Sequence, residues 1–209
     1  MSSFEISNVK DVYDKIYDHF DVTRKSVWVD VKKFIDRIEP NSIIFDAGCG
    51  NGKNMYRKNC FNIGGDFCLG FLDIIKKNNH EGIQINVKDI PFANNCFDYT
   101  ICIAVIHHIK QKQDQIKAIK ELIRITRKKG KILISVWEKH GKYNHGDNFV
   151  RWTLQNKYNK NQSNSILNRY YYMFEEKELY TDILRNINNI MIESYTSNFN
   201  NRFIILTKL

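Results

Sequence analysis

The stretch from Ile43 to Gly52, IIFDAGCGNG, decides the fold of this chain. Its apolar first half ends at Asp46 and is typical of a buried strand, and the glycines that follow predict a tight turn. A glycine-rich turn between a strand and a helix is the context in which proteins bind nucleotides. The spacing is G-x-G-x-G, not the dinucleotide pattern G-x-G-x-x-G. The stretch therefore predicts a nucleotide-like ligand at the end of a parallel strand.

Beyond this turn, short apolar segments alternate with amphipathic ones, which is typical of a parallel sheet with helices on both faces. We expect strands at 43–46, 61–66, 83–87, 99–105 and 131–137, helices near 69–76 and 116–125, and finally a helix near 175–185 and strands at 190–195 and 202–209. The helix that contains Ile125 is expected to end at Gly130. The predicted fold is α/β, a mostly parallel seven-stranded sheet with a terminal antiparallel hairpin.

The chain has 209 residues, which suits a single domain over 1–209, and no linker divides it. Residues 13–38 predict one or two helices, and we expect the N-terminal segment 1–40 to cover the active site. The stretch 138–168 is polar and predicts a long loop or insertion.

The charge balance favours a polyanionic partner, because 32 Lys and Arg against 23 Asp and Glu leave a net charge of +9. Nucleic acid and an acidic membrane surface both fit this excess. Asn, Ile and Lys are all common, as in the products of AT-rich genomes, so part of the excess reflects composition. No apolar run approaches the ~18 residues of a membrane span, so we expect no membrane association.

The cysteines point to a reducing compartment. There are five, an odd number, and none forms a C-x-x-C pair, so neither a disulfide framework nor a metal cluster is expected. The N-terminus shows no basic stretch followed by an apolar core, as a signal peptide would. We expect a cytoplasmic protein, with the nucleus as a second location.

The ligand expected at the glycine turn is a cation. An acid at the strand end, Asp46, repels phosphate, and the P-loop Lys-Ser/Thr is absent. S-adenosylmethionine, with its ammonium and sulfonium groups, is such a ligand. Asp66 and Asp89 end the next two expected strands, where they would accept from the ribose hydroxyls and the adenine amino group. The full set of expected cofactor contacts is Tyr13, Asp46, Gly48, Cys49, Gly50, Asn51, Gly52, Asp66, Phe67, Asp89, Ile90 and Ile103.

Seven segments together resemble one family, the tRNA wobble-uridine carboxymethyl methyltransferases. They are Tyr13–Arg24, Asp46–Lys53, Gly65-Asp66, Phe97–His108, Asp147–Leu154, Arg169–Leu179 and Asn201–Phe203. The resemblance covers nearly the whole chain and implies the Rossmann-like class I methyltransferase fold. The Asn/Asp-Pro-Pro-Tyr and Pro-Cys motifs of nitrogen and C5 methylation are absent.

The resemblance implies that the acceptor is the carboxylate of 5-carboxymethyluridine at the wobble position, which becomes a methyl ester. A carboxylate has a pKa near 4 and is ionised at pH 7, so it needs no general base. Arg24 is the candidate for a bidentate grip on it. His107 and His108, at the end of the fourth expected strand, are expected to line the uridine pocket or support the corner. Asn201 is expected to face the acceptor.

The resemblance also implies two macromolecular partners, the tRNA anticodon loop and a small zinc-binding activator subunit in a heterodimer. Aromatic side chains that could stack on RNA nucleobases are Trp152, Tyr170 and Tyr171. Basic side chains suitable for contacts with RNA phosphates are Lys110, Lys112, Arg127, Lys128, Lys129, Lys131, Arg151, Lys157, Lys160 and Arg169.

Two other functions remain open at this point: a small-molecule carboxyl O-methyltransferase, and a non-catalytic tRNA-binding subunit with the same fold. The first would act without RNA. The second would be expected to lose Asp46, Gly48, Gly50 or Asp66, all of which are present.

Overall fold

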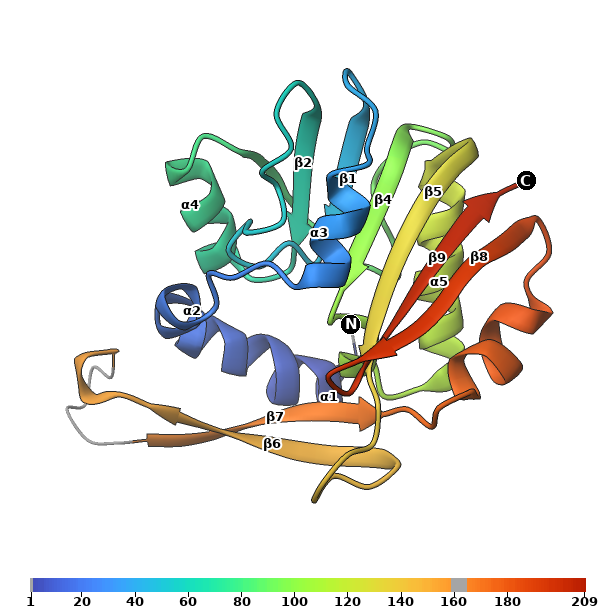
Figure 1. Ribbon diagram of the computed structural model, residues 1–209. Helices are drawn as coiled ribbons and strands as arrows, with labels where there is room; N and C mark the ends of the chain where they lie inside the picture. The colour runs from blue at the N-terminus through green and yellow to red at the C-terminus, as the bar shows by residue number, and fades with distance from the viewer. Residues whose placement is uncertain (1, 159–164) are drawn as a thin grey trace.

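A central sheet organises the protein, whose computed structural model describes residues 2–158 and 165–209 (Figure 1). The sheet has seven strands in the order β3-β2-β1-β4-β5-β9-β8. Their bounds are β1 Ile43–Ala47, β2 Phe61–Asp66, β3 Glu81–Gln84, β4 Phe97–Ile103, β5 Thr126–Trp137, β8 Ile190–Asn198 and β9 Asn201–Lys208. Strands β1 to β5 pair in parallel, and β9 is antiparallel to both β5 and β8. This confirms the predicted Rossmann-like architecture with its terminal antiparallel hairpin.

Helices cover both faces of the sheet because its central strands are apolar on both sides. Ile44 and Ile101 pack in one core with α3 (Val29–Ile35), whereas Phe45 and Cys102 pack in another with α5 (Lys112–Ile125). The other helices are α1 Ser3–Glu5, η1 Ile6–Lys10, α2 Asp11–Thr23 and α4 Leu69–Lys77, with short turns η2 Ile106–His108, η3 Asn156–Tyr158, η4 Leu179–Ile183 and η5 Leu184–Asn186. No helix of the described residues is long and apolar enough to cross a membrane.

Several predicted boundaries were wrong. Strand β3 covers Glu81–Gln84 instead of 83–87, so the chain leaves the sheet before Val87, and β4 ends at Ile103 instead of 105. Helix α5 ends at Ile125 rather than at Gly130, because the backbone of Thr126 is already extended and begins β5. The hydroxyl of Thr126 bonds the carbonyl of Leu122 and the hydroxyl of Thr100 at this junction.

Within the stretch 138–168, expected to be a long loop or insertion, the described residues include β6 (Gly146–Leu154), which pairs with β7 (Ser165–Met173) in an antiparallel ribbon; residues 159–164 lie outside the described part of the chain. Val150, Trp152 and Leu154 are buried at alternate positions of β6. Trp152 and Leu154 pack in one hydrophobic cluster with residues of α2. Figure 1 shows the ribbon running beneath α2, along the end of the central sheet. The polar composition hid this alternation, which places apolar side chains on the face toward the helix.

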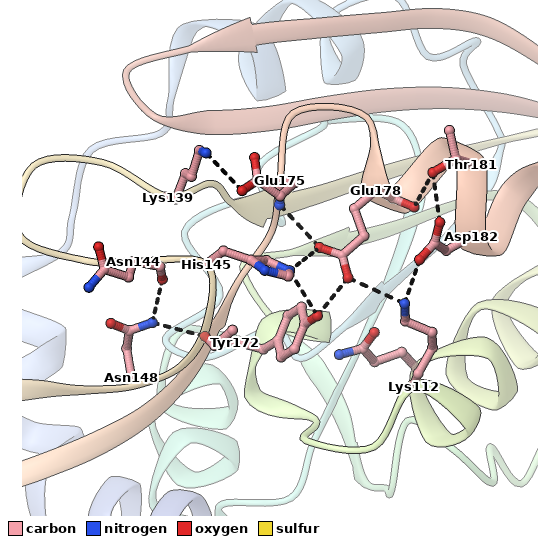
Figure 2. A network of polar contacts seen from close by, with 12 residues as sticks. Lys112, Lys139, Asn144, His145, Asn148, Tyr172, Glu175, Glu178, Thr181 and Asp182 are labelled. Atoms are coloured by element: carbon pink, nitrogen blue, oxygen red, sulfur yellow. Dashed lines mark hydrogen bonds and ion pairs between the residues drawn. The ribbon is translucent and has the colours of Figure 1, made fainter.

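A buried carboxylate, Glu178, ties the base of the ribbon to the rest of the fold (Figure 2). It accepts from the Tyr172 hydroxyl at 2.6 Å, meets Nε2 of His145 at 2.9 Å, and pairs with Lys112 of α5 at 3.4 Å. The helix expected near 175–185 is a π turn followed by a 3₁₀ turn just beyond this carboxylate. The network therefore holds one end of β6–β7 against α5.

Candidate functional site

A cleft with two lobes opens at the carboxyl ends of β1, β2 and β4, the edge at which such sheets bind ligands. The lobes have volumes of about 910 and 450 Å³, with the open space at their entrances included, and share Gly48, Asp66, Phe67, Val105 and His108. The larger lobe is also lined by Tyr13, Phe20, Arg24, Trp28, Cys49, Gly50, Asn51, Lys53, Asn54, Phe71, Ile103, Ala104, Trp137, Arg169 and Tyr171. The smaller lobe is also lined by Glu5, Val9, Ile85, Asn86, Val87, Lys88 and Ile109.

The glycine turn leaves room for a ligand close to the backbone. Gly48 has φ +81°, and a Cβ there would lie 2.2 Å from Cγ2 of Val105, so no other residue fits. Gly48 N donates to the Gly65 carbonyl, which ties the turn to β2. Gly52 does not line the cleft; a Cβ at Gly52 would lie 2.7 Å from Ile75, so its role is in packing.

Two buried acids flank the turn. Asp66 lines both lobes and accepts from Gly50 N and Cys68 N, each at 2.9 Å. Asp46 lies beneath the lining instead of in it, is 1% exposed, and neither oxygen has a hydrogen-bond partner among the described residues. Burial raises the pKa of Asp46 to about 7, with help from Asp66, and that of Asp66 to about 6.

This geometry fits S-adenosylmethionine. Buried carboxylate oxygens without partners are rare, and those of Asp46 suit a cationic ammonium group or a water that it binds. Asp66 keeps lone pairs free toward the cleft for two ribose hydroxyls. Eight of the expected cofactor residues line the cavity: Tyr13, Gly48, Cys49, Gly50, Asn51, Asp66, Phe67 and Ile103.

The expected adenine contacts were misplaced. Asp89 is exposed and lies outside both lobes, and Ile90 is buried away from them with its N–H donated to Glu121. The reason is the early end of β3, which puts Asn86 into the lobe that Asp89 was expected to reach. The Asn86 amide offers both a donor and an acceptor to a base edge.

The N-terminal residues reach over the smaller lobe. Glu5 and Val9 line it, and Glu5 pairs with Lys88 at 2.8 Å in a buried contact. Lys88 also pairs with Asp114 at the start of α5. These pairs join α1 to the loop after β3 and to α5.

Of the two adjacent histidines, only His108 lines the cleft. Its Nδ1 lies 2.7 Å from the carbonyl of Tyr170 and must donate to it, which leaves Nε2 to accept from the Tyr13 hydroxyl at 3.0 Å. Burial lowers the pKa of His108 to about 3, so the ring is neutral. The bond to Tyr13 holds α2 against the end of β4.

His107 lies outside the lining and supports the corner behind it. Its Nδ1 accepts from Trp137 N at 3.0 Å, and its ring stacks on Tyr171 at 4.8 Å. Burial holds its pKa well below the usual range. His107 is therefore the histidine that supports the turn between the end of β4 and the following loop, a role that we expected for one of the two.

Of the two other residues expected to contact the acceptor, Arg24 lines the cleft and Asn201 does not. Arg24 follows α2, lines the larger lobe and is exposed, with its guanidinium 5.1 Å from the Trp152 ring. Asn201 does not line the cleft, because its amide donates to the Phe199 carbonyl in the β8–β9 turn. Its Oδ1 is buried without a hydrogen-bond partner among the described residues, and the role expected of Asn201 toward the acceptor stays a prediction.

The sequence reasoning missed several aromatic and charged lining residues. Trp137 ends β5, and Arg169 and Tyr171 come from β7. Trp152, Tyr170 and Tyr171 were expected to meet RNA bases, yet all three are buried. The alternation of β6 was the signal that could have placed the ribbon beside the cleft.

The fold and the glycine turn with its acids define a class I, S-adenosylmethionine-dependent methyltransferase, and the family model described as "Methyltransferase domain" matches residues 45–134. A tRNA (carboxymethyluridine(34)-5-O)-methyltransferase of Schizosaccharomyces pombe is 33% identical over 199 residues, covering 84% of this chain and 86% of the relative. The chain belongs to this family of tRNA (carboxymethyluridine(34)-5-O)-methyltransferases.

Two further relatives are much longer than this chain. Proteins of the same name from Xenopus tropicalis and Arabidopsis thaliana are 38% and 37% identical over 68% and 60% of this chain, which spans only 23% and 31% of their lengths. Among solved structures, the methyltransferase in a complex with the Haloferax volcanii Trm112 activator has a TM-score of 0.68 at 13% identity, covering 96% of this chain and 97% of that one. The amino pentose methyltransferase CalS10 of Micromonospora echinaspora has a TM-score of 0.71 at 12% identity, covering 93% and 97%. These structural likenesses support the fold.

Proposed function

We propose that this protein transfers a methyl group to the carboxylate of 5-carboxymethyluridine at the wobble position of tRNA, giving the methyl ester. The observation that carries the proposal is the similarity, over 84% of this chain and 86% of the relative, to the S. pombe enzyme of that name. The cleft supports it, because the larger lobe contains the cations Arg24, Lys53 and Arg169, whereas Lys88 of the smaller lobe is paired with acidic side chains. Cationic side chains suit an anionic acceptor.

The chemistry asks little of the side chains beyond binding and orientation. When bound, S-adenosylmethionine supplies an electrophilic methyl group on sulfur. The acceptor carboxylate is already ionised, so no residue must remove a proton. Neutral His108 fits this requirement, because its Nε2 is occupied by Tyr13. The protein's contribution is to align the carboxylate oxygen with the methyl group and to exclude water.

The tRNA would approach along the ribbon. Arg151 and Lys157 lie on or beside β6 with exposed side chains, whereas Lys110, Lys112 and Arg127 are paired with Asp147, Asp182 and Asp98. Residues 127–131 lie in the first part of β5, at the end of the sheet opposite to Trp137 and the cleft. Lys160 lies outside the described residues. We infer that Arg151 and Lys157 contact phosphates.

The partner that we propose is a small zinc-binding activator subunit. Support comes from the Haloferax volcanii neighbour, whose structure is a complex with the Trm112 methyltransferase activator. Strand β3 is an edge of the sheet with exposed residues at Glu81, Gly82 and Gln84, where a partner strand could add. Co-expression with such a subunit, followed by size-exclusion chromatography, tests the heterodimer. We also propose a cytoplasmic location, which fluorescence microscopy of the tagged protein tests.

The decisive experiment uses the purified chain, with and without that subunit, labelled S-adenosylmethionine and tRNA that lacks the terminal ester. Label on tRNA that mild alkali releases marks an ester. Alkali-stable label, or none on tRNA, would contradict the proposed reaction. Turnover on free small carboxylic acids without RNA would favour the small-molecule alternative, and cofactor-independent tRNA binding without transfer would favour a non-catalytic subunit.

A further inference from the structure

The guanidinium of Arg169 is a buried charge at the wall of the larger lobe. The residue is 5% exposed and lines the cavity. Its Nε has no hydrogen-bond partner in the part of the chain that the structure describes, and no ion pair among those residues includes it. An unpaired buried charge is costly, and native proteins usually compensate it.

Aromatic rings hold this charge in place without neutralising it. In the β6–β7 register Arg169 lies opposite Val150, on the same ribbon face as Trp152 and Tyr171. Its guanidinium carbon is 4.6 Å from the centre of the Trp152 ring and 5.2 Å from that of Tyr171. Cation–π contacts of this kind stabilise a guanidinium but leave its N–H donors free.

Among the residues that the structure describes, no carboxylate forms an ion pair with Arg169. His107 and His108 are neutral, and the nearby hydroxyls belong to Tyr13, whose hydrogen bond helps to raise the pKa of Arg169, and to Tyr143 and Tyr171. The other guanidinium of the lobe, Arg24, contacts the same Trp152 ring but is exposed and donates to the carbonyl of Thr23. One arginine is thus fixed in the wall and the other stands at the surface.

We propose that Arg169 is the receptor for the acceptor's carboxylate and the residue that distinguishes a carboxymethyl from a carbamoylmethyl group. This inference rests on the proposed function and assigns the grip first expected of Arg24 to a residue deeper in the lobe. A carboxylate accepts two parallel hydrogen bonds from a guanidinium. In a carboxamide an NH₂ group replaces one of the two oxygens, so one N–H of the guanidinium would face another hydrogen-bond donor. Arg24 would then close over the bound group from the mouth.

The test compares binding of two anticodon stem-loop RNAs that differ only in 5-carboxymethyluridine or 5-carbamoylmethyluridine at the wobble position. The full chain is used with its activator subunit and S-adenosylhomocysteine. Wild type is expected to bind the carboxymethyl RNA at least ~30-fold more tightly, and Arg169→Met to bring the ratio close to one. Arg169→Lys keeps the charge but loses the fork, so its ratio is expected to be intermediate.

Two controls separate this role from others. Arg151→Met changes an exposed arginine of the same ribbon and is expected to weaken both RNAs equally, as a phosphate contact would. Binding of S-adenosylhomocysteine shows that each variant is folded. If Arg169→Met weakens both RNAs equally, or if both Arg169 variants retain the wild-type ratio, the inference is overturned. A wild type that binds both RNAs equally would also overturn the inference, whereas a wild type that transfers no alkali-labile methyl group to the carboxymethyl RNA would contradict the proposed function.

Discussion

The hydroxyl of Tyr13, on α2, lies 3.0 Å from Nε2 of His108, just beyond the end of β4. The carbonyl of Tyr170 fixes the tautomer of the ring from the other side, so a helix, a sheet end and the ribbon meet at one imidazole. His108 is therefore a structural junction in the wall of the cleft.

Removing that hydroxyl should loosen the junction. Tyr13→Phe leaves a buried imidazole nitrogen without its donor and is expected to cost about 1–2 kcal/mol of stability and about tenfold in methyl transfer. Chemical denaturation and the alkali-release assay measure the two effects. Tyr17→Phe, on the same helix, removes a hydroxyl that meets Asp18 instead of His108 and serves as the control. Equal effects of the two variants would argue against the junction.

Asp46 is expected to destabilise the ligand-free protein at neutral and alkaline pH. Burial raises its pKa in the folded state to about 7, above the ordinary value of 3.8, so stability falls as the pH rises from about 4 to 7 and stays at the lower level above 7. Asp46→Asn should raise the melting temperature at pH 8 by about 3 °C or more while abolishing cofactor binding. Asp73→Asn, an exposed change on α4, should alter neither. A lower melting temperature for Asp46→Asn would show that neighbouring groups offset the cost of burying the ionised carboxylate.

Cofactor affinity should fall as the pH decreases. Below pH 7 the carboxyl of Asp46 is protonated in the ligand-free protein, and Asp66 follows near pH 6, so the charges that attract a cation are lost. We expect affinity about tenfold weaker at pH 6 than at pH 8, with proton release on binding. Calorimetry in two buffers of different ionisation enthalpy measures both quantities. A flat profile with no proton release would refute the assignment of these acids.

Arg24→Ala should abolish most methyl transfer and leave cofactor binding intact. The side chain lines the lobe from the mouth and makes no bond to the glycine turn through its guanidinium. We expect at least ~100-fold lower kcat/KM for tRNA, because a charged contact to the acceptor is lost. Lys25→Ala, the exposed neighbour, is the matched control. Loss of S-adenosylhomocysteine binding in Arg24→Ala would mean that the residue belongs to the cofactor site.

Much of the fold was predictable, because parallel strands buried on both faces leave a strong apolar signal. The expected strand 61–66 coincides with β2, and the glycine turn lies where its spacing indicated. The ribbon was missed because its apolar residues alternate singly with polar ones in a stretch rich in Asn and Lys. Once the strand pairing is known, alternation places Arg169 on the face of Trp152. Its burial depends on that pairing and on α2, which no local pattern contains.

The misplacement of Asp89 has a different origin. An acid that follows an apolar segment looks like the end of a strand, but β3 leaves its pairing with β2 after Gln84. Backbone pairing decides which side chain reaches the cleft, and the resulting shift replaces a carboxylate by the Asn86 amide. Local composition does not encode this register.

Helix α2 lies beside both the cofactor site and the proposed acceptor site. Tyr13 and Phe20 line the lobe beside the glycine turn, and Arg24 directly follows the helix at the mouth. A ligand that ordered this helix against the sheet would lower the entropic cost for the next one to bind. In that case thermodynamic reciprocity would require the cofactor and the proposed tRNA substrate to strengthen each other's binding by the same factor. The affinity measured for either one alone would then understate the affinity of the working complex.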